Sequence, residues 1–237
     1  MFLRSSGGRP LVIGHRGAAA LAPENTLAGL EAAVASGADL VEFDVAAGLV
    51  VEHPGSPRVQ KPPSLDDALD YVAGRGIGVH IDLKHDGIEA EVARAVRRHD
   101  LAGRAIVSST RGGALRRLEL ADPSLARAIS YPHDRYGAAG LPWPRPVVSS
   151  AAACLRPAMR VRLPPLLATA KAQALSVRHE LVGRALVEAT HARGAALIAW
   201  TVNDATAVGR LAVAGVDAIV SDDPGMALRA LATLDWP

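Results

Sequence analysis

Four charged side chains form two pairs, and each pair is spaced two residues apart at the end of a short apolar run. Glu42 and Asp44 form the first pair, and Asp82 and Lys84 form the second. Residues two apart on a strand point to the same face, so each pair is expected to share one surface. Three converging carboxylates repel one another, and burial strengthens that repulsion. A divalent cation relieves it, and these oxygen ligands suit Mg²⁺ or Ca²⁺.

The alternative is ordinary inward and outward alternation along each strand, with Lys84 only neutralising a carboxylate. A single Glu-x-Asp pair favours that alternative. A second pair, on the next predicted strand, favours a metal site instead.

Two of the eight histidines lie where acid–base chemistry needs them. His15 follows an apolar run directly, and His53 ends the run L-V-V-E-H. Imidazole titrates near neutral pH, which suits proton transfer in catalysis. His80 lies inside a predicted strand and is expected in the core, whereas His85 and His133 are left unassigned.

The elements that must position these residues alternate along the chain. Short runs rich in Val, Ile and Leu are typical of strands buried on both faces of a parallel sheet. The predicted strands are Leu11–Gly14, Leu40–Val45, Gly78–Lys84, Ala105–Ser109, Ala126–Ser130, Ala174–Val177, Ala196–Val202 and Ala218–Ser221.

Ala-rich segments with helix start and stop signals separate these strands. Those segments open at 24–26 and span 64–74, 88–99, 177–191 and 203–215. About eight βα units predict a single (β/α)₈ barrel over residues 1–237, with a doubly wound open sheet as the alternative. Residues 1–10 are expected to form a tail. Residues 132–172, rich in Pro and Arg, are expected to form irregular loops over one rim.

Composition limits the class of protein. Hydrophobic residues make up 49% and charged residues 21%, which favours a large core over disorder. A net charge of +2, with no basic tract carrying aromatic residues, does not indicate a nucleic-acid partner. Cys154 is the sole cysteine, so no internal disulfide forms. No apolar run is long enough to cross a membrane, and we expect a cytoplasmic protein.

Several motifs, in order along the chain, carry a resemblance to a known family. They are G-H-R-G at 14–17, P-E-N-T at 23–26, G-A-D at 37–39, V-E-F-D-V at 41–45, I-D-L-K at 81–84, A-W-T-V-N at 199–203 and G-V-D-A-I-V-S-D-D-P at 215–224. Together they resemble the glycerophosphodiester phosphodiesterase family, whose fold is a (β/α)₈ barrel. The resemblance spans residue 11 to about residue 228.

The resemblance implies a role for each candidate site residue. The implied ligands of a divalent cation, Mg²⁺ or Ca²⁺, are Glu42, Asp44 and Asp82. The implied acid–base pair is His15 and His53, without saying which is the acid. The residues implied to hold the phosphate and substrate, or to brace the rim, are Arg16, Lys84, Trp200, Glu24 and Asn25.

Trp200 has packing at the barrel mouth as its alternative role. Asp222 and Asp223 are expected to be structural caps at the start of the last helix.

Three features depart from the family pattern: Asp82 replaces a glutamate, Pro54 replaces an aspartate after His53, and most of a small insertion before Asp82 is missing. A more open site is expected.

The expected reaction is hydrolysis of a glycerophosphodiester to an alcohol and sn-glycerol 3-phosphate. One alternative is a non-catalytic barrel that binds phosphorylated ligands. Another is a phospholipase D-like enzyme or lyase acting on lysophospholipids, for which residues 156–162 and Leu166-Leu167 offer a surface. A solvated loop is the favoured interpretation of that stretch, so membrane contact is not expected. The expected partner is a small phosphodiester, and the oligomeric state is left open.

Overall fold

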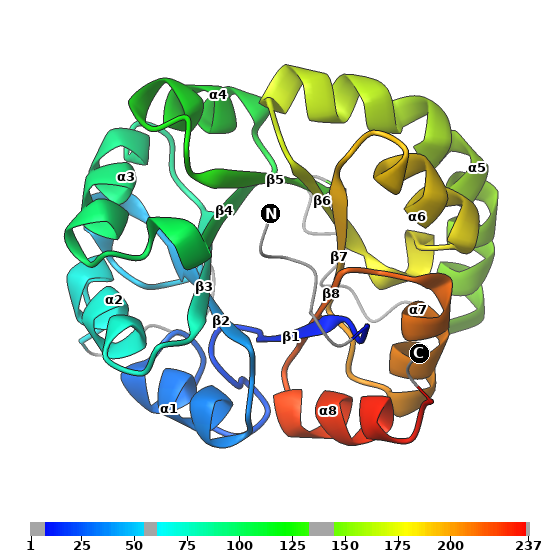
Figure 1. The fold of residues 1–237 in the computed structure, drawn as a ribbon, viewed down its shortest axis with the longest axis horizontal. Coiled ribbons are helices and arrows are strands. Elements are labelled where there is room, and N and C mark those ends of the chain that lie inside the picture. The colour runs from blue at the N-terminus through cyan, green and yellow to red at the C-terminus, as the bar shows by residue number, and fades with distance from the viewer. Residues whose placement is uncertain (1–7, 55–60, 133–144, 236–237) are drawn as a thin grey trace.

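Eight parallel strands close into a barrel that carries helices on its outside (Figure 1). The computed structural model describes residues 8–54, 61–132 and 145–235, and for 145–153 only the backbone. Neighbouring strands follow chain order, and β8 pairs back with β1. This closure confirms the predicted (β/α)₈ barrel and excludes the open sheet.

Strand positions follow the short apolar runs of the sequence. The strands are β1 (Leu11–Gly14), β2 (Leu40–Val45), β3 (Gly78–Leu83), β4 (Ala105–Ser109), β5 (Ala126–Tyr131), β6 (Ala174–Arg178), β7 (Ala196–Trp200) and β8 (Ala218–Ser221). Four strands have the predicted bounds, three differ by one residue, and β7 ends at Trp200 rather than Val202.

Helices follow the strands around the barrel. They are α1 (Leu27–Ala35), α2 (Leu65–Ala73), α3 (Glu89–Arg98), α4 (Gly112–Ala121), α5 (Arg145–Ala170), α6 (Arg184–His191), α7 (Ala205–Ala214) and α8 (Pro224–Ala232). Ser64 forms the capping box of α2, and Asp204 accepts a hydrogen bond from Ala207 N at the start of α7. Gly215 ends α7 in the left-handed conformation, which glycine adopts without strain.

Side-chain alternation along β2 decides which residues face the barrel interior. Leu40 packs into the inner cluster that Ile13, Ile106 and Ile198 also form. Phe43 and the other odd-numbered residues of β2 pack outward against the helices. Residues with the parity of Leu40 therefore point inward, where alanines and branched side chains fill a barrel that has few aromatic residues.

The stretch 132–172 corrects one prediction. Residues 133–144, including His133, lie outside the described part of the chain, but Arg145–Ala170 form α5 rather than loops. Its apolar residues Met159, Leu163, Leu167 and Ala170 are buried against the barrel. Their spacing of three to four residues is a helical stripe, which the prolines and arginines of this segment obscured.

A second correction concerns the helix predicted over 177–191. Val177 and Arg178 belong to β6, a 3₁₀ turn follows at His179–Leu181, and α6 begins only at Arg184. Gly183 precedes α6, so the sequence did carry a break at this position. In the described part of the chain, no helix combines the length and apolarity needed to cross a bilayer.

Candidate active site

The carboxyl ends of β1, β2 and β3 bring the predicted acidic residues to one mouth of the barrel. Glu42 and Asp44 share the inward parity of Leu40, and Asp44 pairs in register with Asp82 on β3. Glu42 and Asp44 are both buried, with 4% and 1% of their surface exposed. Alternation does not separate the members of each pair, because both members point inward.

Asp44 lies at the centre of a polar network. Lys84 Nζ lies 2.8 Å from its Oδ1, and Arg16 Nε lies 3.1 Å from its Oδ2. Asn25 donates from Nδ2 to Asp44 Oδ2 and accepts from Asp44 N, both at 3.0 Å. Burial raises the pKa of Asp44, but the charges of Lys84 and Arg16 outweigh it and lower the pKa overall.

Glu42 has less compensation than Asp44. Its Oε2 accepts a hydrogen bond from Arg16 N at 2.7 Å. Burial, followed by the charge of Asp44, raises the pKa of Glu42 to about 7, although His15 opposes this shift. Asp82 adds to the same repulsion. Burial and the neighbouring carboxylates therefore outweigh the neighbouring cations in setting the pKa of Glu42.

Asp82 is held by a chain of hydrogen bonds from β3 to β4. Ser108 Oγ donates to Asp82 Oδ1 at 2.5 Å, and His80 Nε2 lies 2.8 Å from Ser108 Oγ. Burial lowers the pKa of His80 to about 4, so its ring is neutral at pH 7. Because the hydroxyl proton of Ser108 goes to Asp82, the proton of His80 lies on Nε2. His80 is thus a core residue, as predicted, and it also supports a site carboxylate.

Lys84 connects the two strands. Its ammonium forms ion pairs with Asp44 and with Asp82, so it lies between their carboxylates. Burial lowers the pKa of Lys84, but the two aspartates outweigh burial and raise it. Within residues 8–54, 61–132 and 145–235, no three His, Cys, Asp or Glu side chains are arranged to hold a metal ion.

The loop after β1 carries Arg16, Glu24 and Asn25 into the site. Arg16 Nη1 donates to Glu24 Oε2 at 2.8 Å. Arg16 and Asn25 adopt positive φ angles of 47° and 57°. Gly17 has φ +86°, and a Cβ there would lie 2.3 Å from the backbone carbon of Gly29. The close approach of this loop to α1 explains the glycine of the G-H-R-G motif.

His15 is fixed by a residue that the sequence did not assign to the site. His15 Nδ1 lies 2.6 Å from Asp222 Oδ1. Asn203 in turn binds Asp222, accepting from its backbone N at 2.9 Å and donating to its carboxylate. The prediction that Asp222 caps the last helix is wrong, because its carboxylate faces His15. Asp223 is the cap, accepting from Met226 N at 2.8 Å.

The sequence did contain a signal for Asp222. In a closed parallel barrel β1 and β8 are neighbours, so the residues that follow them meet. His15 and Asp222 each directly follow the last residue of their strand, Gly14 and Ser221, which pair in register.

His53 and Trp200 are two further residues that the sequence predicted for the site. His53 is half-buried, and Asp44, Arg16 and Lys84 are close enough to influence its charge. Burial is the largest cause of the lowered pKa of His53. Trp200 ends β7 and packs against the inner apolar cluster, and its buried Nε1 has no hydrogen-bond partner among the described residues.

Pro54 follows His53, and a proline side chain cannot give the imidazole the support that a carboxylate would. His80 does not supply that support, because its Nε2 is bonded to Ser108 and its Nδ1 has no partner among the described residues. His85 is exposed.

Comparison with known proteins identifies the family. The family model described as "Glycerophosphoryl diester phosphodiesterase family" matches residues 15–48 and 77–226. A glycerophosphodiester phosphodiesterase from Caldanaerobacter subterraneus is 26% identical over 91% of this chain and 95% of its own length. His53 lies in the segment between the two matched ranges.

Solved structures of similar fold cover nearly the whole chain. An Oleispira antarctica phosphodiesterase, in complex with the product sn-glycerol-3-phosphate, aligns with a TM-score of 0.71 and 22% identity. That alignment covers 95% of this chain and 98% of the other. A glycerophosphodiester phosphodiesterase from Agrobacterium tumefaciens aligns with a TM-score of 0.68 and 21% identity, over 93% and 99% of the two chains. These likenesses establish the shared barrel fold.

The barrel and the charged residues at its mouth agree with the match to the family model over most of the sequence. The chain therefore belongs to the glycerophosphoryl diester phosphodiesterase family, a family of phosphodiester hydrolases.

Proposed function

We propose that this chain hydrolyses glycerophosphodiesters to an alcohol and sn-glycerol 3-phosphate, using His15 and His53 as its acid–base pair. The observation that carries the proposal is the convergence of three carboxylates with Arg16 and Lys84 at the carboxyl ends of β1 to β3. Active sites of (β/α)₈ barrels form at this end of the strands. The product named for the Oleispira antarctica relative supports the same substrate class.

A divalent cation, which proteins of this family generally use, is proposed as the partner of the three carboxylates once their side chains draw together. Glu42, Asp44 and Asp82 offer hard oxygen ligands, and a cation would offset the burial and the carboxylate repulsion that raise the pKa of Glu42. Holding one ion with all three carboxylates requires Lys84 to leave its place between Asp44 and Asp82. The bound cation would supply electrostatic stabilisation of the charge that develops on the phosphoryl oxygens. Mg²⁺ and Ca²⁺ both suit these ligands.

Arg16 and Lys84 are proposed to bind the phosphate. Arg16 is a partly buried cation that already lies beside Asp44, and Lys84 would turn to the phosphate on leaving its place between Asp44 and Asp82. A phosphodiester gains negative charge on attack, and preorganised cations stabilise that charge. Glu24 and Asn25 are proposed to hold Arg16 and Asp44 in position, through the hydrogen bonds described above.

The opposite pKa shifts of the two histidines support a division of their roles. Burial lowers the pKa of His15, but the bond to Asp222 and the charge of Glu42 outweigh burial and raise it. The pKa of His53 is lowered, chiefly by burial. A protonated His15 suits the general acid, which donates to the leaving alkoxide from Nε2. A neutral His53 suits the base, which takes a proton from water or from the neighbouring glycerol hydroxyl.

Trp200 is proposed to line the glycerol end of the substrate. Its buried indole N–H lacks a protein partner among the described residues, and a substrate oxygen would satisfy it. A cytoplasmic location stays a prediction from the sequence.

The test is turnover of glycerophosphocholine and of bis(p-nitrophenyl) phosphate by wild type, His15→Ala and His53→Ala, with Mg²⁺, Ca²⁺ or EDTA. We expect metal-dependent turnover that falls by about a hundredfold or more in each variant. Wild-type protein that is folded but inactive with every metal contradicts hydrolysis and favours a phosphate-binding barrel. Activity that survives both substitutions contradicts the assigned acid–base pair.

A further inference from the structure

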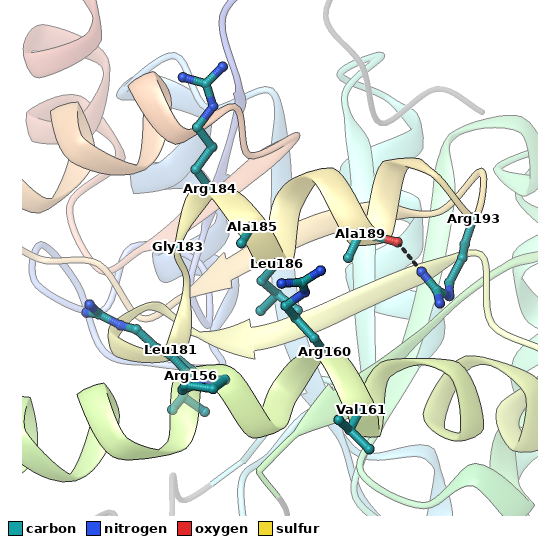
Figure 2. Close-up of a pocket in the computed structure, with 11 residues that line it drawn as sticks. Arg156, Arg160, Val161, Leu181, Gly183, Arg184, Ala185, Leu186, Ala189 and Arg193 are labelled. Carbon is teal, nitrogen blue, oxygen red and sulfur yellow. Dashed lines mark hydrogen bonds between the residues drawn. The ribbon is translucent and has the colours of Figure 1, made fainter.

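A groove lies on the outside of the barrel between α5 and α6, away from the residues assigned to catalysis. Its volume is about 630 Å³. Figure 2 shows the two helices on either side of it, with Arg160 from α5 and Arg193 from the turn after α6 at its edges. This volume falls in the range of about 300–1,000 Å³ that is typical of small-molecule sites.

The polar lining of the groove is entirely cationic. Four arginines line it, Arg156, Arg160, Arg184 and Arg193, and no acidic residue does. Only Arg184 has an acidic partner, Glu188 at 2.9 Å, and its head group points away from the groove in Figure 2.

The other three guanidinium groups have no acidic partner among the described residues. Arg156 and Arg193 donate to the backbone carbonyls of Glu180 and Ala189, at 2.9 and 2.8 Å. Arg160 has no hydrogen bond or ion pair in the described part of the chain. Arg156 and Arg160 lie four residues apart on one helix, a spacing at which like charges repel.

Arg210 lies behind this cluster and shows the same excess of charge. It donates to the carbonyls of Val182 and His179, both at 3.1 Å. Burial lowers the pKa of Arg210, and the charge of Arg156 lowers it further, although the charge of Glu180 opposes the shift. An anion at the groove would relieve this repulsion.

The remaining lining is apolar. Leu181 and Leu186 are buried beneath the groove, and Ala185 and Ala189 lie along α6. Val161 on α5 leaves 78% of its surface exposed beside them. An inorganic anion would leave this apolar surface in water, whereas an alkyl chain would cover it.

The start of α6 adds backbone N–H donors at one end of the groove. Gly183 precedes this helix and offers no side-chain cap, and Gly183, Arg184 and Ala185 all line the groove. Helix N-termini favour anions through their free N–H groups and the helix dipole.

We propose that the α5–α6 groove binds an anionic amphiphile, a carboxylate or phosphate head group that carries an alkyl chain. Arg160 and Arg193 bind the head group, and Leu181, Leu186 and Val161 contact the chain. Such a ligand reaches the groove either as a free molecule or as a lipid in a membrane. The site is separate from the barrel mouth, so its occupation does not require the proposed hydrolysis.

The test measures binding of decanoate by calorimetry and binding of phosphatidylglycerol vesicles by sedimentation. Decanoate is used because it lacks the phosphate that the barrel mouth is proposed to bind. The groove variant is Arg160→Glu/Arg193→Glu, and the matched control is Arg116→Glu, an exposed arginine of α4 without a described partner. We expect saturable binding of about one decanoate per chain, weakened about tenfold or more in the groove variant and unchanged in the control.

The two arms identify the source of the ligand. Decanoate binding lost in the groove variant supports a free amphiphile, and vesicle binding lost in that variant supports a membrane lipid. Absence of binding in both arms, or binding that the groove variant retains, overturns the proposal. Arg160→Gln/Arg193→Gln replaces the charge-reversed protein if that protein does not fold. Diester turnover is expected to stay unchanged, because neither arginine lies at the barrel mouth.

Discussion

Replacing Asp222 with asparagine removes a negative charge 2.6 Å from His15 Nδ1 while preserving the size of the side chain. Asn203 binds the other carboxylate oxygen of Asp222 and also its backbone N. An asparagine at 222 that accepts from Asn203 turns its amide N–H groups toward His15. Nδ1 of His15 must then accept, so its single proton moves to Nε2.

The expected loss follows from the strength of this contact. Hydrogen bonds to charged groups contribute about 1.5–3 kcal/mol. Each 1.36 kcal/mol corresponds to about a tenfold change in rate, so kcat should fall about 10- to 100-fold in Asp222→Asn. The loss falls on kcat more than on KM, because Asp222 orients a proton donor and does not contact the substrate.

The pH profile distinguishes orientation from simple damage to the fold. The hydrogen bond from His15 to Asp222 raises the pKa of His15. Its loss lowers that pKa, so an acid at His15 loses its proton at lower pH. The alkaline limb of the kcat profile should therefore move to lower pH.

The assay is the kcat of glycerophosphocholine hydrolysis across the pH range, with Asp223→Asn as the matched control. Asp223 is the neighbouring carboxylate, but it caps α8, and asparagine caps a helix equally well. Wild-type kcat with an unmoved alkaline limb in Asp222→Asn refutes the role given to Asp222. Equal losses in both variants refute it as well.

Three further substitutions test other parts of the site. Glu42→Gln should stabilise EDTA-treated protein at pH 8 by at most about 3 kcal/mol, measured by urea unfolding. The pKa of Glu42 is about 7 in the folded protein and 4.5 ordinarily, so ionisation of Glu42 makes the wild-type protein less stable as pH rises between those values. An unchanged or lower stability contradicts the raised pKa of Glu42. Ser108→Ala should weaken Mg²⁺ binding about tenfold by calorimetry, because it removes the hydrogen bond to Asp82 and leaves buried His80 Nε2 unpaired. A wild-type affinity for Mg²⁺ would contradict the role of Ser108 in holding Asp82. Gly17→Ala should cost about 2–4 kcal/mol in urea unfolding, because its Cβ meets Gly29. The control is Gly209→Ala on α7, where a Cβ would meet no atom, and this variant should not be destabilised. Equal losses of stability in the two variants would contradict the close approach of Gly17 to Gly29.

The sequence predicted the barrel because its signals are local and repeated. Buried parallel strands appear as short apolar runs, and capping residues such as Ser64 and Asp204 mark helix starts. The position of Glu42 and Asp44 on one face followed from strand periodicity alone. The structure adds that this face points into the barrel.

The missed features depend on contacts between distant segments or on competing local signals. The pairing of His15 with Asp222 joins residues 207 positions apart, and it requires the closure of the barrel. The link from Asp82 through Ser108 to His80 requires the register of β3 and β4. Helix α5 was missed because Pro157, Pro164 and Pro165 argue against a helix locally, whereas the burial of its apolar stripe outweighs them.

The identity of the product tests the central claim most directly. Wild-type protein, treated with EDTA and then supplied with Mg²⁺ or Ca²⁺, is incubated with glycerophosphocholine and followed by ³¹P NMR. The account predicts that the diester signal is replaced by that of sn-glycerol 3-phosphate only after metal is added. Release of phosphocholine, a cyclic phosphate that accumulates as the final product, or a diester that persists with either metal in folded protein would contradict it.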